Sequence, residues 1–178
     1  MRLAAGAPYA NEVVWLRPNE IAGCKQPVLF ADGVEPGDVI QGTLSDCWIL
    51  SALSMCATAE GLIENLFEDL DHEKNARYSK IGMYVCRFYK NGQWLKVIVD
   101  DRIPCWAEDN TPVFARCKDA NEIWVLLVEK AYAKLHGCYE ALGGGEIDYG
   151  LRDLTGMPCL LRQVSVFYYS WCCRWCPT

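Results

Sequence analysis

The sequence predicts an α+β fold of about one domain. Two segments carry apolar residues at helical spacing, one following Asp46 and the other covering residues 122–136. A third segment, residues 82–101, reads as two strands that flank Asn91-Gly92, a dipeptide suited to a two-residue hairpin turn. At 178 residues the chain is long enough to bury one sizeable core.

The overall charge excludes some partners. The formal net charge is -6, and no cluster of Lys or Arg is longer than two residues. The chain therefore offers no basic patch that could bind phosphate backbones or anionic membranes, and we expect no nucleic-acid partner. No run of eighteen uncharged apolar residues exists, and the first eight residues are a poor secretory signal. We expect a soluble, cytoplasmic protein without a transmembrane segment.

The eleven cysteines do not read as a disulfide framework. Most stand singly in apolar segments, where a free thiol behaves as a small hydrophobe, so buried and reduced cysteines are the favoured interpretation. The end of the chain holds a C-x-x-C pair, Cys173 and Cys176. A zinc knuckle would need a second such pair, so an accidental Cys-rich tail is the better explanation.

Residues 1–40 are predicted to form an irregular lead-in segment. Prolines interrupt every candidate helix there, and turn residues occur at Asp32-Gly33 and at 35–38. The first helix follows Asp46, a good N-cap residue, and its buried face is predicted from the spacing of Ile49, Ala52, Leu53 and Cys56.

The hairpin is predicted to pair residues 83–89 with residues 94–99. The clearest helix covers residues 122–136, with Glu122 at its start and Lys130 and Lys134 near its end, as the helix dipole favours. Its apolar stripe consists of Trp124, Leu127, Val128, Ala131 and Leu135.

Cys47 stands where the loop at residues 41–46 passes into the first helix. A thiol at that point lies beside unpaired amides and the positive end of the helix dipole, which lower its pKa and favour the reactive thiolate. Gln41 could fold back so that its amide and the Cys47 N–H converge on one oxyanion. From the spacing alone, an ordinary first-turn cysteine with a loop glutamine remains an equal alternative.

Residues 41–53, QGTLSDCWILSAL, resemble the segment around the nucleophile of calpain-type cysteine proteases, with Ser45 where many members have Gly. The similarity continues in WLRPNEI at 15–21, VDDRIP at 99–104, NEIW at 121–124 and the helix that follows. It covers about 140 residues, from Trp15 to Gly156.

This resemblance implies a papain-like cysteine protease fold, and within it the helical, nucleophile-bearing half, domain I of the calpain protease core. It implies that Cys47 is the nucleophile and that Gln41 is the oxyanion donor. The family's catalytic His and Asn belong to a second half that this chain does not match. Of the two histidines, His72 is best explained as a solvated loop residue and His136 as a helix C-terminal residue.

The resemblance also implies a Ca²⁺ site in this half. Asp38 and Glu122 match its two carboxylates, and Ala31 and Gly33 match positions that supply backbone carbonyls; such oxygens suit this hard cation. Without the resemblance, Asp38 as a turn cap and Glu122 as a dipole partner would be preferred. Pro36 replaces an Arg that pairs with the second half in the family.

The sequence therefore predicts a lead-in with a calcium loop (1–40), a calpain-like protease core subdomain I (41–156) and a divergent Cys-rich tail (157–178). The expected function is calcium-dependent hydrolysis of protein substrates by a cysteine endopeptidase, whose core is truncated and needs a second half supplying His and Asn. A catalytically silent calpain-like interaction module and a Cys-rich metal-binding protein remain the alternatives.

Overall fold

The computed structural model describes residues 3, 7, 9, 11–68 and 80–159. Its helices and strands mix along the chain, as expected for an α+β fold. In chain order they are β1 (Val13–Leu16), β2 (Val39–Ile40), α1 (Cys47–Cys56), β3 (Met83–Lys90), β4 (Gln93–Asp100), β5 (Ile103–Trp106), β6 (Arg116–Cys117), α3 (Trp124–His136) and α4 (Ile147–Thr155). Short 3-10 turns cover Pro18–Glu20, Pro36–Asp38, Glu64–Leu66 and Glu140–Leu142. No described helix is long and apolar enough to cross a membrane.

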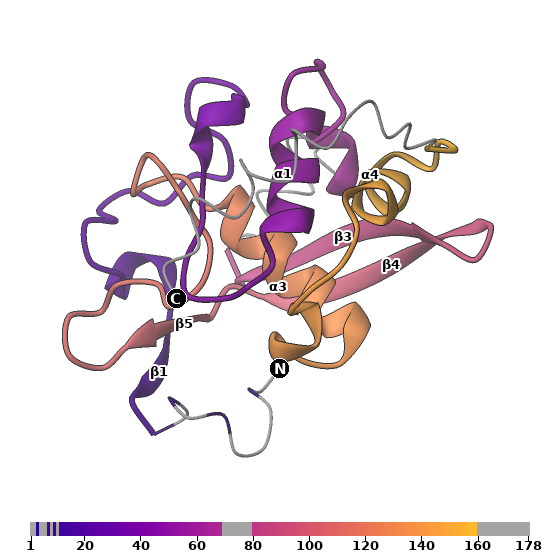
Figure 1. The fold of residues 1–178 in the computed structure, drawn as a ribbon. Helices are drawn as coiled ribbons and strands as arrows, with labels where there is room; N and C mark the ends of the chain where they lie inside the picture. Colours follow the sequence, from indigo (N-terminus) through magenta and orange to yellow (C-terminus); the bar gives the residue numbers. More distant parts are fainter. Residues whose placement is uncertain (1–2, 4–6, 8, 10, 69–79, 160–178) are drawn as a thin grey trace.

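Helix α3 is the centre of the core. The predicted apolar stripe understates its burial, since every residue from Trp124 to Ala133 is buried. Helix α1 packs the predicted apolar face inward and adds Leu50 to it. Figure 1 shows α1 beside α4, and the close packing depends on Gly150, where an added Cβ would lie 2.9 Å from the Cβ of Ala52.

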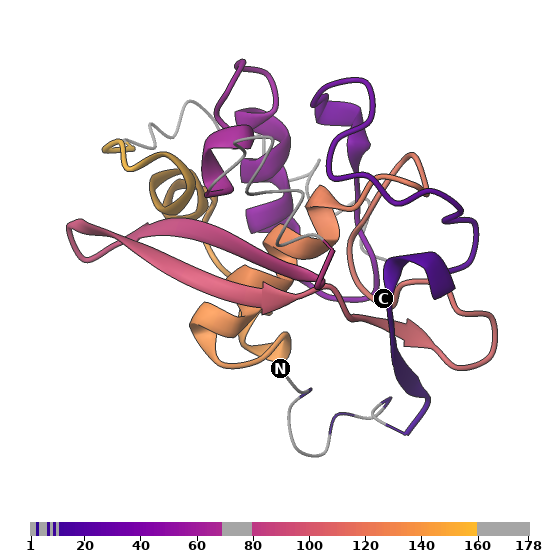
Figure 2. The same ribbon diagram turned by 180° about the vertical axis from the view of Figure 1, so that it is seen from behind.

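The β3–β4 hairpin confirms the predicted strand pair. Lys90 pairs with Gln93, so Asn91 and Gly92 form the two-residue turn, and both have the positive φ angles, 51° and 83°, that this tight turn requires. The hairpin runs along α3 on the side seen in Figure 2. It therefore closes one side of the core with the buried side chains of Cys86, Phe88, Val97 and Val99.

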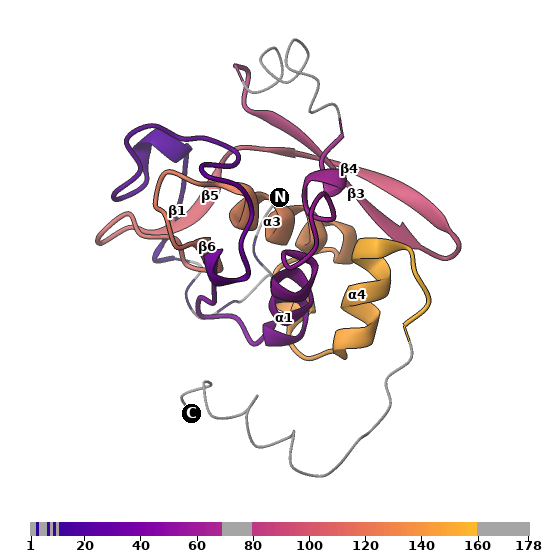
Figure 3. The same cartoon turned by 90° about the horizontal axis from the view of Figure 1, so that it is seen from above.

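Two further strand pairs show that the lead-in is more ordered than predicted. Strand β1 pairs with β5, and β2 pairs with β6, both antiparallel. Figure 3 shows these short strands gathered on one side of α3, with α4 on the other. The expectation of an entirely irregular segment at residues 1–40 was therefore wrong, because prolines exclude long helices but allow short strands paired with distant partners.

Candidate active site

Cys47 is the first residue of α1 and is half-buried. The Asp46 carbonyl accepts the N–H groups of Ile49 (3.0 Å) and Leu50 (3.3 Å), so the helix begins directly at the thiol. A helix start carries unpaired amides and a partial positive charge, both of which stabilise a thiolate. The position predicted from the sequence is thus the one that the structure shows.

The other described cysteines contrast with Cys47. None of the eight cysteines of the described residues is in a disulfide, and five of them are buried. Burial raises the pKa of Cys56 to about 11 and that of Cys105 to about 12, and it also raises the pKa values of Cys24, Cys86 and Cys117. These thiols are held in the unreactive neutral form at neutral pH. Cys138 and Cys159 are half-buried, and neither lies at the start of an α-helix.

Gln41 lies on the loop that leads into α1. Its Nε2 donates to the Leu44 carbonyl at 2.9 Å, which folds the side chain back along the loop. A glutamine amide has a second N–H that this hydrogen bond does not use. The loop itself is held by Thr43, whose N–H and hydroxyl donate to the Val113 carbonyl at 3.1 and 2.9 Å.

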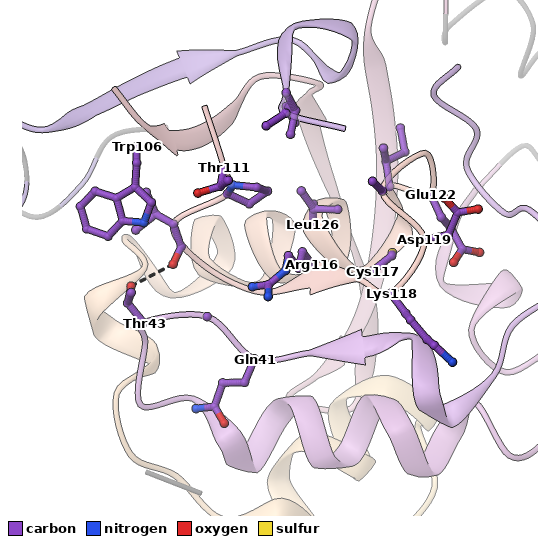
Figure 4. Close-up of a pocket in the computed structure, with 17 residues that line it drawn as sticks. Gln41, Thr43, Trp106, Thr111, Arg116, Cys117, Lys118, Asp119, Glu122 and Leu126 are labelled. Carbon is purple, nitrogen blue, oxygen red and sulfur yellow. Dashed lines mark hydrogen bonds between the residues drawn. The ribbon is translucent and has the colours of Figure 1, made fainter. Parts of the chain in front are cut away.

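A cavity of about 450 Å³ borders this loop, and Figure 4 shows its lining. Gln41 and Thr43 lie on one side, and Trp106, Arg116 and Glu122 are among the other residues around it. The cavity therefore connects the candidate oxyanion donor with one of the candidate calcium ligands.

Trp48 holds a glycine-rich loop against α1. Its Nε1 donates to the Leu142 carbonyl at 2.8 Å, and the Gly144 N–H donates to the Ser45 carbonyl at 3.0 Å. A Cβ on Gly145 would lie 2.4 Å from the Trp48 ring, so only glycine allows this close approach. Trp48 has the packing role expected from the sequence, and the loop at 143–145 borders the nucleophile.

The candidate calcium ligands converge on one region. The buried Glu122 carboxylate accepts the Ala31 N–H at 3.1 Å, which ties the loop at 31–38 to the start of α3. Burial raises the pKa of Glu122, and the nearby Asp38 and Asp119 carboxylates raise it further. Asp38 accepts the Glu35 N–H at 2.8 Å and therefore also caps a turn. Gly33, at a φ of 106°, has open space around it.

These residues offer a mixed set of carboxylate and backbone carbonyl oxygens, which suits a hard cation, rather than a site made of side chains alone. The described residues contain no group of three His, Cys, Asp or Glu side chains that could hold a metal. Two neighbouring carboxylates and exposed loop carbonyls are, however, a donor set that Ca²⁺ accepts. Glu122 precedes α3, which starts at Trp124, so it reaches the loop rather than serving as a residue of the helix.

Asp46 differs from its prediction. It occupies the N-cap position, yet its side chain makes no capping hydrogen bond and is completely buried. It points into the core, where it meets Glu129 of α3, a second buried acid. The sequence signal for this pair is Glu129 itself, a charged residue inside a strongly apolar helix.

Other predicted features lie away from the site or outside the described residues. The Nδ1 of His136 lies 2.9 Å from the Tyr132 carbonyl, in keeping with a position at the end of α3. Lys130 is buried and does not serve the helix end as predicted. His72 and the C-x-x-C pair at Cys173 and Cys176 lie outside the described residues.

The mixed fold and a cysteine at the head of a buried helix are consistent with the class of papain-like cysteine proteases. The model of a family described as calpain family cysteine protease matches residues 4–167. The chain therefore belongs to the calpain family. The match extends eleven residues beyond Gly156, where the motifs recognised in the sequence end.

Three relatives illustrate the similarity. The chain is 43% identical over 146 residues to the calpain-type cysteine protease ADL1 of Oryza sativa subsp. japonica, covering 80% of this chain and 6% of the relative. It is 38% identical over 148 residues to calpain-5 of Caenorhabditis elegans, covering 83% of this chain and 22% of the relative. It is 36% identical over 166 residues to calpain-8 of Homo sapiens, covering 93% of this chain and 22% of the relative. The chain thus spans less than a quarter of each relative's length.

Proposed function

We propose that this chain supplies the nucleophile-bearing half of a calcium-dependent cysteine endopeptidase that cleaves protein substrates. The observation that carries the proposal is the position of Cys47, half-exposed at the start of α1 while five other thiols are buried. Free thiols persist in reducing compartments, which supports a cytoplasmic location.

In the proposed reaction, the Cys47 thiolate attacks the carbonyl carbon of a peptide bond. The carbonyl oxygen becomes an oxyanion, which the Gln41 amide and the Cys47 N–H stabilise by hydrogen bonds. Collapse of this intermediate breaks the C–N bond, releases the amine with a proton from the general acid, and leaves a thioester on Cys47. Water then attacks the thioester carbonyl, the C–S bond breaks, the acyl part leaves as a carboxylic acid, and the Cys47 thiol is restored.

The general acid and base come from outside this half. Of the described residues only His136 is a histidine, and its Nδ1 contacts the Tyr132 carbonyl within α3. A base must reach the proton that it abstracts, and a papain-like site takes its His and Asn from a second half. We propose that such a second half is the partner of this chain.

The first prediction concerns hydrolysis by this chain and a partner. The chain alone should leave a fluorogenic peptide or casein intact, whereas its mixture with a separately expressed His- and Asn-bearing half of a relative should cleave the substrate when Ca²⁺ is added. Cys47→Ser is the control and should abolish cleavage. No cleavage by the mixture, with the two halves shown to associate, would favour the catalytically silent module instead.

Calcium would be held by Asp38 and Glu122, together with the backbone carbonyls of Ala31 and Gly33. The bound ion would supply positive charge between two carboxylates and so join the loop at 31–38 to the start of α3. The contact of Glu122 with the Ala31 N–H supports this proposal, because it already brings that loop beside the acid.

The second prediction is that calorimetry will detect Ca²⁺ binding to the chain and that Asp38→Ala will remove it. Binding at a hundred times Kd stabilises a folded protein by about 2.7 kcal/mol, so Ca²⁺ should also raise the melting temperature. Asp32→Ala is a matched control, since Asp32 lies on the same loop without being a mapped ligand. Equal heats from the chain and Asp38→Ala would remove the calcium site.

A further inference from the structure

Two buried carboxyl groups face each other behind the nucleophile. Asp46, immediately before Cys47, is 0% exposed, and Glu129 of α3 is 2% exposed. Both Asp46 oxygens lack a hydrogen-bond donor among the described residues. Both Glu129 oxygens accept the Ala115 N–H, at 3.0 and 3.2 Å. Neither acid is therefore satisfied by the other if both are ionised, because a carboxylate can only accept.

A single proton resolves this conflict. If Glu129 is protonated, its hydroxyl can donate to the Asp46 carboxylate while its other oxygen still accepts the Ala115 N–H. Burial raises the pKa of Asp46 to about 6, and burial together with the Asp46 charge raises the pKa of Glu129 well above its usual range. The two groups titrate as a pair that keeps one proton near neutral pH.

The neighbouring titratable groups do not supply a compensating cation. Burial is the main cause that raises the pKa of Tyr139 and keeps its hydroxyl neutral. Coulombic interactions with both acids, Asp100 and Cys105 raise it further. Cys105 is also neutral, because burial raises its pKa to about 12. The charge of Asp100 is balanced by Lys130. Among the described residues, no basic side chain acts on either acid.

We propose that Glu129 is a positioning residue for Cys47, because it donates the hydrogen bond that holds the Asp46 carboxylate behind the first turn of α1. The Asp46 carbonyl accepts the first amides of the helix, so fixing Asp46 also fixes the Cys47 N–H. That N–H is the oxyanion donor of the proposed function, on which this inference rests. The pair also keeps a single negative charge beside the thiol instead of two.

The shared proton makes a prediction about pH and stability. The folded pair keeps a proton that the unfolded chain releases near the ordinary carboxyl pKa of about 4. The pair therefore destabilises the folded state increasingly at higher pH, and the free energy of unfolding declines as pH rises above about 4.5. Glu129→Gln keeps both hydrogen bonds but carries no exchangeable acid proton. In the unaltered chain the retained proton lowers the folding equilibrium constant tenfold for each pH unit above about 4.5, and Glu129→Gln should abolish that contribution.

The third prediction is measured on the thiol itself. The rate of Cys47 alkylation by iodoacetamide, followed by peptide mass spectrometry from about pH 5 to about pH 10, reports the midpoint of its ionisation. Glu129→Gln should leave this midpoint unchanged, because Asp46 stays a hydrogen-bonded carboxylate. Asp46→Asn removes the adjacent charge and should lower the midpoint by about one pH unit.

Both substitutions preserve side-chain volume, and melting curves will show that the variants fold. A midpoint in Asp46→Asn equal to that of the unaltered chain would overturn the proposal, as would an equal displacement in Glu129→Gln. A pH dependence of stability in Glu129→Gln equal to that of the unaltered chain would also overturn it. None of these measurements requires peptide hydrolysis, so a failure of the proposed function is distinguishable from a failure of this inference.

Discussion

Gly42→Ala should destabilise the chain by about 3 kcal/mol or more and displace the loop that carries Gln41, with a loss of hydrolysis in the two-half mixture of about 100-fold. An added Cβ would lie 2.2 Å from the carbonyl oxygen of Phe114 and 2.5 Å from its Cα. These atoms are backbone, so no side-chain rotation can relieve the overlap. Either the loop or the backbone at 113–114 must move.

The effect reaches the site because the loop is short and doubly held. Thr43, next to Gly42, is bonded to the Val113 carbonyl, and Gln41 is bonded to the Leu44 carbonyl. A shift at Gly42 therefore moves the Gln41 amide relative to Cys47. Thermal denaturation and the hydrolysis rate of the mixture measure the two consequences.

Gly37→Ala is the matched control for this substitution. Gly37 has no atom within 4 Å of an added Cβ and does not have a positive φ angle, so alanine should fit there with little cost. If Gly42→Ala melts and reacts like Gly37→Ala, the close approach to Phe114 is not a constraint on the loop.

The parts of the fold that were predictable are those specified by local sequence. Asn91 and Gly92 dictate the hairpin turn by their tolerance of positive φ, and the register follows from the turn. The apolar spacing after Asp46 likewise specifies the buried face of α1. The position of Cys47 at a helix start was predictable, but only the resemblance to calpain-type proteases favoured it as the nucleophile over an ordinary first-turn cysteine.

The parts that were missed depend on distant partners. Strand β2 has two residues and pairs with β6 more than seventy residues away, and neither segment is long enough to show a period. Glu129 and Lys130 read as surface residues of a helix, yet α3 is buried on all sides from Trp124 to Ala133. Each of the two side chains has its hydrogen-bond partner in another segment. Local propensity contains no information about such partners.

Lys130 shows what this burial implies for stability. Its side chain is 1% exposed, and its Nζ donates to the carbonyls of Asp100 (2.9 Å) and Arg102 (2.5 Å) as well as to the Asp100 carboxylate. The ammonium also lies 5.3 Å from the centre of the Trp15 ring. Burial lowers the pKa of Lys130, and the Asp100 hydrogen bond opposes this shift. One cation thus joins α3 to the turn between β4 and β5.

Lys130→Met should lower the free energy of unfolding by roughly 2–4 kcal/mol. Methionine fills similar space, so the main cost comes from lost hydrogen bonds. The carbonyls of Asp100 and Arg102 would stay buried from water but lose their donor. The Asp100 side chain is 59% exposed and can be rehydrated, which limits the cost below that of a fully buried unpaired charge. Urea denaturation measures the change.

Lys96→Met is the control that separates this effect from the loss of any surface lysine. Lys96 pairs with Glu68 at 2.6 Å, but its side chain is 64% exposed, so its removal should cost less than about 1 kcal/mol. Equal losses from the two substitutions would mean that the carbonyls at Asp100 and Arg102 do not depend on Lys130. A much larger loss from Lys130→Met would show that a buried lysine on α3 anchors the turn between β4 and β5.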